Sequence, residues 1–209
     1  MNPGTDPIET PVSKWRLATL SLLALSIMMP VTLPVPILRE LVGDRFAVSE
    51  LMTSLFMSIN MIGAAIAAPF AGALADRIGK RRPLVIGALL VDAVCFIGMT
   101  LDTSFGVFLA IRLVEGCAHI FALSLVLSIA ASLGGIANRG LSMGITGAGM
   151  MLGVAIGAPI GGILGRVDTL QPLMTGSIVL VGAALLASLT LLESSGSEAR
   201  PSTKRLNWD

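Results

Sequence analysis

Four ionisable residues interrupt stretches of the sequence that are otherwise almost free of charge. Arg112, Glu115 and His119 are spaced so that they share one face of a helix, and Asp92 stands in the preceding apolar stretch. A carboxylate near a guanidinium and an imidazole can form an ion pair or take up and release a proton. The sequence shows no nucleophile with a partner base, no metal-ligand cluster and no nucleotide-binding loop. We therefore expect neither an enzyme nor a bound cofactor or metal.

The overall composition indicates that these charges lie in a membrane. The chain has 209 residues, of which 54% are hydrophobic and 13% are charged. Soluble domains contain about 25% charged residues. The net charge is +1, and no basic tract suggests nucleic-acid binding. Cys95 and Cys117 fall inside apolar segments at different expected depths, so we expect two buried thiols rather than a disulfide.

Charged residues divide the sequence into apolar segments long enough to cross a bilayer. Uncharged runs of 22, 25, 26 and 24 residues follow Arg16, Glu50, Arg139 and Asp168. About 20 apolar residues span a bilayer as a helix. The sequence predicts an all-α membrane protein with six transmembrane helices at about 17–38, 51–75, 83–101, 105–130, 141–165 and 170–192.

The distribution of Lys and Arg predicts the orientation of these helices. With both termini on one side, ten basic residues lie on that side and three, Arg39, Arg45 and Arg166, lie on the other. Lys and Arg are enriched in cytoplasmic loops. We expect a multi-pass protein of the plasma or inner membrane, with residues 1–16 forming a cytoplasmic segment and 193–209 a flexible cytoplasmic tail.

The intramembrane charges are expensive enough to suggest function. Each charged side chain at a helix centre costs about 2.5–3.5 kcal/mol on insertion scales. Asp92 and Arg112 each lie ten residues from Asp102 in the expected turn, so they should share a depth and form an ion pair if their faces meet. A purely structural pair is the alternative. We expect Glu115, next to Arg112, to be the proton-coupling group, with Asp92 as its rival and His119 nearby.

An internal repeat supports a transporter architecture. Residues 68–74 and 158–164 share the pattern A-P-x-x-G-x-L at a separation of 90 residues. In the expected topology, the two copies lie on helices that run in opposite directions. Inverted three-helix repeats are a known construction of secondary transporters.

The stretch GALADRIGKRR, residues 72–82, is expected to join the second and third helices. It resembles the signature loop of the major facilitator superfamily, matching it at Gly72, Leu74, Asp76, Arg77, Gly79, Lys80 and Arg81. The resemblance covers the whole chain and implies half of that family's twelve-helix fold, namely the N-terminal six helices as two inverted three-helix repeats. It also implies that Asp76 and Arg77 brace the contact between halves and bias inward-open against outward-open states. A charged turn that only sets topology is the alternative.

Two shorter patterns resemble family motifs less closely. Arg112-x-x-Glu115-Gly116 is similar to R-x-x-Q-G, with Glu in place of Gln. A pattern in the expected helix over 141–165 resembles a signature of drug:proton antiporters, with Ala158 at its proline position; the matching residues are Gly153, Gly157, Pro159, Gly161 and Gly162.

Glycine and proline also predict how two helices pack. A glycine every four residues from Gly149 to Gly165 predicts a smooth ridge for close helix packing. Three prolines, Pro30, Pro34 and Pro36, predict kinks in the first helix. Ser54, Ser58 and Asn60 in the second helix are candidates to line a pathway.

These observations predict a secondary transporter that moves a small solute by alternating access, with proton-coupled efflux or antiport. Its expected partners are the lipid bilayer, the solute, protons and a second six-helix half. That half could come from a second copy or from a separate chain, and a truncated product is a further alternative. A rival function is a non-transporting membrane scaffold or accessory subunit.

Overall fold

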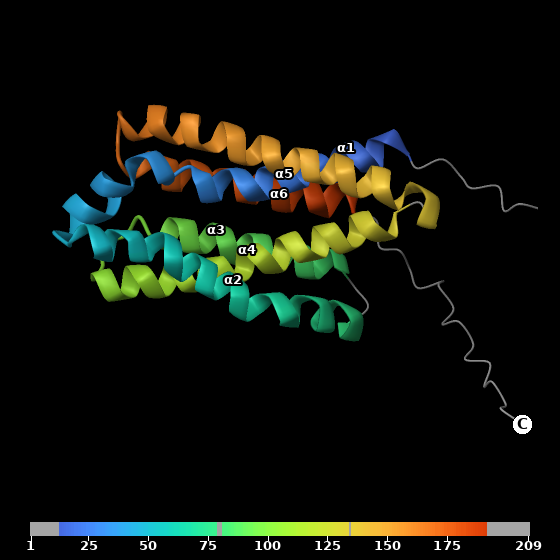
Figure 1. Cartoon of the computed structure of the whole chain (residues 1–209), viewed down its shortest axis with the longest axis horizontal. Coiled ribbons are helices and arrows are strands. Elements are labelled where there is room, and N and C mark those ends of the chain that lie inside the picture. Colours follow the sequence, from blue (N-terminus) through green and yellow to red (C-terminus); the bar gives the residue numbers. More distant parts are fainter. Residues whose placement is uncertain (1–12, 79–80, 134, 192–209) are drawn as a thin grey trace, which may run out of the picture.

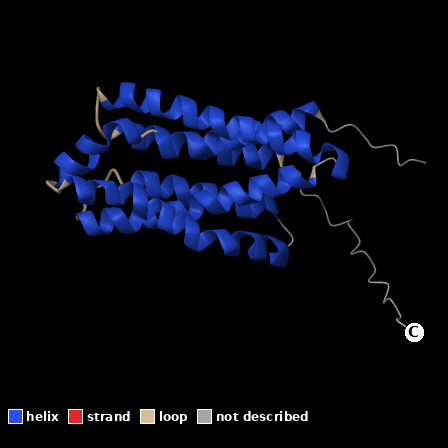
Figure 2. Cartoon of the chain, in the orientation of Figure 1, coloured by secondary structure: helices blue, strands red, loops and turns tan. Residues whose placement is uncertain are grey.

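The computed structural model describes residues 13–78, 81–133 and 135–191, and the regular structure in these ranges is helical (Figure 2). Within these ranges, six long helices run roughly side by side along the bundle (Figure 1). They are α1 Lys14–Thr32, α2 Glu50–Ile78, α3 Arg81–Gly98, α4 Phe105–Ser132, α5 Gly135–Gly165 and α6 Gln171–Thr190.

The helices have the length and composition of membrane spans. Segments of α1, α2, α4, α5 and α6 are long and apolar enough to cross a bilayer. The shorter α3 carries three charged residues, Arg81, Arg82 and Asp92. Large apolar side chains cover the outside of the bundle, such as Ile178, which is 71% exposed. Lipid is the solvent that such a surface requires, and the expected all-α membrane protein is confirmed.

The chain between α1 and α2 departs from the expected single helix over 17–38. Regular α-helix ends at Thr32 and is followed by a 3-10 turn, Val35–Ile37, and a π-helix, Arg39–Asp44. Pro34 and Pro36 cause the change, because proline lacks the N–H that continues an α-helix and its ring crowds the preceding turn. Pro30 remains inside α1.

The bundle consists of two related groups of three helices. In Figure 1, α1, α5 and α6 form one group and α2, α3 and α4 the other. The most extensive contacts join α1 to α5 and α2 to α4. If α1, α2 and α3 are exchanged with α4, α5 and α6, respectively, each of these two contacts becomes the other. This arrangement matches the 90-residue repeat, because Pro69 lies inside α2 and Pro159 inside α5.

Glycine makes these two principal contacts possible. A Cβ at Gly63 of α2 would strike the carbonyl of Leu113 in α4, and a Cβ at Gly153 of α5 would strike the carbonyl of Leu25 in α1. Gly63 and Gly153 are themselves 90 residues apart. Every glycine of the predicted ridge lies against α1 or the residues just after it: Gly149, Gly153, Gly157, Gly161 and Gly165. In lipid, close backbone approach of this kind supplies the van der Waals contact that holds helices together.

Arg45, Arg81 and Arg82 each donate hydrogen bonds to the C-terminal end of another helix. Arg45 donates to the carbonyls of Met99 at 2.8 Å and Leu101 at 2.5 Å, just beyond α3. Arg81 donates to the hydroxyl of Ser132 at 3.2 Å, at the end of α4.

Arg82 makes the third of these contacts, donating to the carbonyl of Ser188 in the last turn of α6. The last carbonyls of a helix lack partners within the helix and carry partial negative charge. Arg81 and Arg82 of the charged stretch therefore tie helix ends together, a role beyond setting the topology.

The glycine contact predicts a difference between two substitutions in α5. Gly153→Ala should lower the free energy of unfolding by about 1–3 kcal/mol, because its methyl group would overlap the α1 backbone. Gly147→Ala is the matched control, since no atom lies within 4 Å of its added Cβ, and alanine gains up to about 1 kcal/mol of helix propensity there. Denaturant titration in lipid bicelles measures both. Equal effects of the two substitutions would contradict the glycine contact.

Candidate functional site

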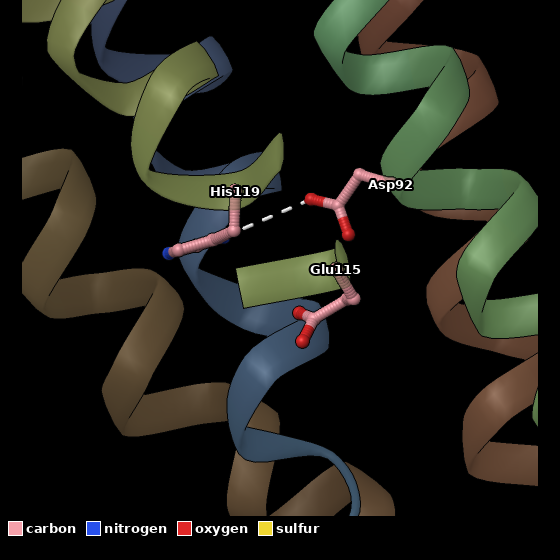
Figure 3. A group of neighbouring side chains, drawn as sticks. All are labelled: Asp92, Glu115 and His119. Atoms are coloured by element: carbon pink, nitrogen blue, oxygen red, sulfur yellow. Dashed lines mark ion pairs between the residues drawn. The ribbon is translucent and has the colours of Figure 1, made fainter. Parts of the chain in front are cut away.

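The four intramembrane ionisable residues come together in one buried cluster. Asp92 lies on α3, and Arg112, Glu115 and His119 lie on α4. Figure 3 shows Asp92 reaching from α3 toward Glu115 and His119. Asp92, Arg112 and Glu115 are 0% exposed and His119 is 6% exposed. Asn60 of α2, 1% exposed, completes the group.

Glu115 contacts two other members of the cluster, Arg112 and Asn60. Its Oε2 lies 2.9 Å from Nη1 of Arg112, one helical turn earlier. The same oxygen accepts a hydrogen bond from Nδ2 of Asn60 at 2.5 Å. The guanidinium carbon of Arg112 also lies 4.2 Å from the centre of the Phe56 ring, a cation–π contact that gains strength where water is excluded.

The pairing of Asp92 differs from the expected one. In the described part of the chain, Asp92 forms no ion pair with Arg112. Its ionisable neighbour is instead His119, whose Nδ1 lies 3.8 Å from Oδ2 of Asp92. That distance is too long for a hydrogen bond. The expected Asp92–Arg112 pair was wrong because Glu115, three residues along the same helix, is within reach of Arg112 without any contribution from α3.

Several buried polar atoms of the cluster lack hydrogen-bond partners within the described part of the chain. They are both carboxylate oxygens of Asp92, all three guanidinium nitrogens of Arg112, Oε1 of Glu115 and Nδ1 of His119. The Arg112–Glu115 contact is thus close but not aligned as a hydrogen bond. A buried polar group without a partner costs about 1–3 kcal/mol, and more when it is charged. The cluster therefore has unused capacity to bind a proton, water or another polar species.

Counting charges indicates which species suits the cluster. Two ionised carboxylates and one guanidinium sum to one negative charge when His119 is neutral. One bound proton neutralises that charge. Asp92, Glu115 and His119, which the sequence analysis had grouped as candidates for proton coupling, also place possible metal-ligand atoms within 4.8 Å of one another. A divalent cation, however, would meet the positive guanidinium already bound to Glu115.

Gly116 explains how Asn60 reaches Glu115. A Cβ at Gly116 would strike the backbone of Asn60, so only glycine allows α2 to approach α4 this closely at that point. The pattern Arg112-x-x-Glu115-Gly116 therefore supplies the cation, the carboxylate and the opening for a third helix within five residues. Asn60 had a sequence signal, as the sole amide side chain in 51–75. Phe56 had none.

The other predicted residues lie away from the cluster. Asp76 belongs to α2, sixteen residues beyond Asn60 and hence roughly 24 Å along the helix. The surroundings of Gly72, the side chains of Leu74 and Asp76, and all of Gly79 and Lys80 are outside the described part of the structure. Arg77 is exposed. Ser54 and Ser58 hydrogen-bond to carbonyls of their own helix.

The helix 5 motif also lies apart from the cluster. Gly153 and Gly157 pack against α1, Gly161 packs against Leu33 just after it, and Gly162 lies near Pro36. Pro159 lies within α5. These residues position α1 and do not contribute polar groups to the site.

Comparison with protein families matches residues 20–208 to the family described as Major Facilitator Superfamily. The chain belongs to the major facilitator superfamily. With the six helices and their internal symmetry, this membership establishes an integral membrane protein with half of the superfamily's fold.

The curated relatives of this superfamily member are longer proteins. Multidrug resistance protein 2 of Bacillus subtilis is 27% identical over 74% of this chain and 35% of its own length. Citrate exporter 1 of Aspergillus niger is 27% identical over 72% of this chain and 29% of its own length. Multidrug resistance protein 1 of B. subtilis is 31% identical over 61% of this chain and 33% of its own length. The chain thus spans about a third of the length of these relatives.

The buried pair predicts non-additive effects on stability. Arg112→Met should lower the free energy of unfolding by about 3–5 kcal/mol, because Glu115 would remain buried without its cation. Adding Glu115→Gln to Arg112→Met should recover part of this loss. A double-mutant cycle measured by denaturant titration in bicelles tests the coupling. Arg166→Met, at an exposed position, is the control. Additive effects of Arg112→Met and Glu115→Gln would contradict the pair.

Proposed function

We propose that this protein is one half of a proton-coupled secondary transporter that exports a small solute by alternating access. The observation that carries the proposal is the buried cluster of α3 and α4, which is one positive charge short of neutrality. A buried cluster of this kind is costly, and ionisable groups inside membrane helices mark ion and proton pathways. The names of the superfamily relatives, multidrug resistance proteins and a citrate exporter, support export.

Within the cluster, the contacts divide the two carboxylates into different roles. Glu115 is held by Arg112 and Asn60. Asp92 has no hydrogen-bond partner among the described residues. In this conformation, therefore, Asp92 is the better carrier of the proton, and Glu115 anchors the guanidinium. The contacts favour the residue that the sequence had ranked second.

Proton binding is coupled to the conformational change of the transporter if the partners of these carboxylates differ between the conformations. Opening the bundle to either side would hydrate Asp92 or move Arg112 relative to it. Either change alters the relative free energies of the protonated and ionised forms. Release of the proton to one side can in this way be linked to opening toward that side.

A second six-helix half is part of the proposal. Substrate sites of transporters built from repeats lie at the interface between repeats, near the bilayer midplane. Two copies of this chain related by an axis along the membrane normal, or this chain with a separate half, would supply that interface. In the assembly, Asp76 and Arg77 would brace the contact between halves. By the distribution of basic residues, both termini would face the cytoplasm.

Infrared spectroscopy of the purified chain in nanodiscs tests the proton assignment without knowledge of the substrate. At neutral pH, we expect a protonated-carboxyl band that is lost in Asp92→Asn and kept in Glu115→Gln. Asp168→Asn, at an exposed position, is the control and should leave the band unchanged. Loss of the band in Glu115→Gln alone would reverse the roles of the two carboxylates. Its absence from the unsubstituted chain would contradict proton binding by the cluster.

Transport itself is tested with ethidium in everted membrane vesicles that contain this chain. If two copies form the transporter, native mass spectrometry should show a dimer, and a pH gradient should drive ethidium uptake. Asp92→Asn should abolish that uptake, whereas Asp102→Asn, in an exposed turn, should not. A dimer that takes up no ethidium would argue for the scaffold alternative. A monomer would exclude pairing of two copies and leave a separate half as the partner.

A further inference from the structure

An apolar groove runs along the outside of the bundle between α2 and α3. Its floor is α4, where Val114, Cys117 and Phe121 line it, and its walls include Ala67 of α2 and Gly87 of α3. The groove has a volume of about 360 Å³. It exists because α2 and α3 each pack closely on α4 but scarcely touch one another.

Small residues keep the groove open. A Cβ added at Gly87 would meet no atom within 4 Å. Each of the three helices also contributes an alanine to the lining: Ala67, Ala88 and Ala118. The Cys117 thiol, a weakly polar group in the lining, donates to the carbonyl of Gly63 at 3.2 Å. The groove therefore presents a hydrocarbon surface with its polar groups satisfied.

The position of the groove restricts what can occupy it. Val91 and Val114 on its rim are 47% and 49% exposed, so the rim faces the lipid side of a membrane-spanning bundle. An α-helix with its side chains is about 10–12 Å across, so a single 5.4 Å turn takes up roughly 420–610 Å³, more than the whole groove. An extended peptide would bring backbone N–H and C=O groups to an apolar wall, where they would stay unpaired. An acyl chain has neither problem.

A basic side chain lies at one end of the groove. The α3 wall begins at Pro83, two residues after Arg81, and the Arg81 guanidinium extends along α4 to Ser128 and Ser132. Both of these hydrogen bonds use Nη1, so the Nε and Nη2 groups take no part in them. A guanidinium is well suited to bind phosphate oxygens. Arg81 thus supplies the charge that complements a lipid headgroup at the end of a hydrocarbon slot.

We propose that this groove binds one anionic phospholipid, with an acyl chain between α2 and α3 and the headgroup phosphate at Arg81. The lipid fills the gap between the two helices where they lack direct contact. Because Arg81 also binds the end of α4, the headgroup joins α3, α4 and the lipid at one point. This inference depends on membrane insertion and on the groove, and it is independent of the proposed transport function.

Native mass spectrometry of the full chain tests the proposal, after release from nanodiscs made of equal parts phosphatidylglycerol and phosphatidylcholine. One phosphatidylglycerol per chain should remain bound at activation energies that remove the surrounding lipid. Gly87→Leu fills the groove from within and should abolish this retention. Gly182→Leu in α6 is the matched control, because it also adds its side chain to open space and lies away from the groove. It should leave the retention unchanged.

The headgroup contact is tested separately with Arg81→Gln. It should reduce the preference for phosphatidylglycerol over phosphatidylcholine about fivefold, as expected for one basic residue near anionic lipid. Equal lipid retention in Gly87→Leu and Gly182→Leu would overturn the groove as the site. An unsubstituted chain that retains the two lipids equally would overturn the anionic headgroup.

Discussion

The close approach of two helix pairs, α2 to α4 and α5 to α1, is the constraint on which the rest of the structure depends. Gly63 and Gly116 let the backbones of α2 and α4 touch, and Gly153 and Gly157 do the same for α5 and α1. In a bilayer, lipid tails are as apolar as leucine, so burial of apolar surface alone does not drive helices together. Small residues at the contacts are therefore decisive.

The buried cluster follows from the first of these contacts. With α2 pressed against α4 at Gly116, Asn60 comes within hydrogen-bonding distance of Glu115, and Phe56 comes under the Arg112 guanidinium. The same helix also packs against α3, which carries Asp92. The cluster therefore contains one carboxylate held by polar partners, Glu115, and one without hydrogen-bond partners among the described residues, Asp92. The asymmetry is a consequence of packing, since both residues are acidic and equally buried.

The same contacts explain the outside of the bundle. Because α2 and α3 both pack against α4, they leave between them the groove that ends near Arg81. The arginines at helix ends connect elements that the glycine contacts do not: Arg45 joins the α1–α2 segment to α3, and Arg82 joins α3 to α6. Arginine side chains thus connect the helices at their ends, and glycine contacts hold them together along their length.

The helices, the superfamily, the glycine ridge of α5 and the group of intramembrane ionisable residues could all be predicted from the sequence. Uncharged runs predicted the helices, because a bilayer of known thickness sets the length of a span, and GALADRIGKRR with its neighbours identified the superfamily. The glycines at intervals of four predicted the α5 ridge, since they recur on one helix face. Arg112, Glu115 and His119 were grouped by their spacing on one helix face and Asp92 by its expected depth, and the cost of charge in a membrane marked the group as functional.

The tertiary structure alone decided how these residues pair. Equal distance from a turn set Asp92 and Arg112 at a similar depth, but depth does not determine the rotation of a helix about its axis. The partner of Arg112 is Glu115, and the partner of Glu115 is Asn60 on another helix, fifty-five positions away in the chain. Sequence spacing determines neighbours within a helix, whereas neighbours between helices depend on where glycine lets two backbones meet.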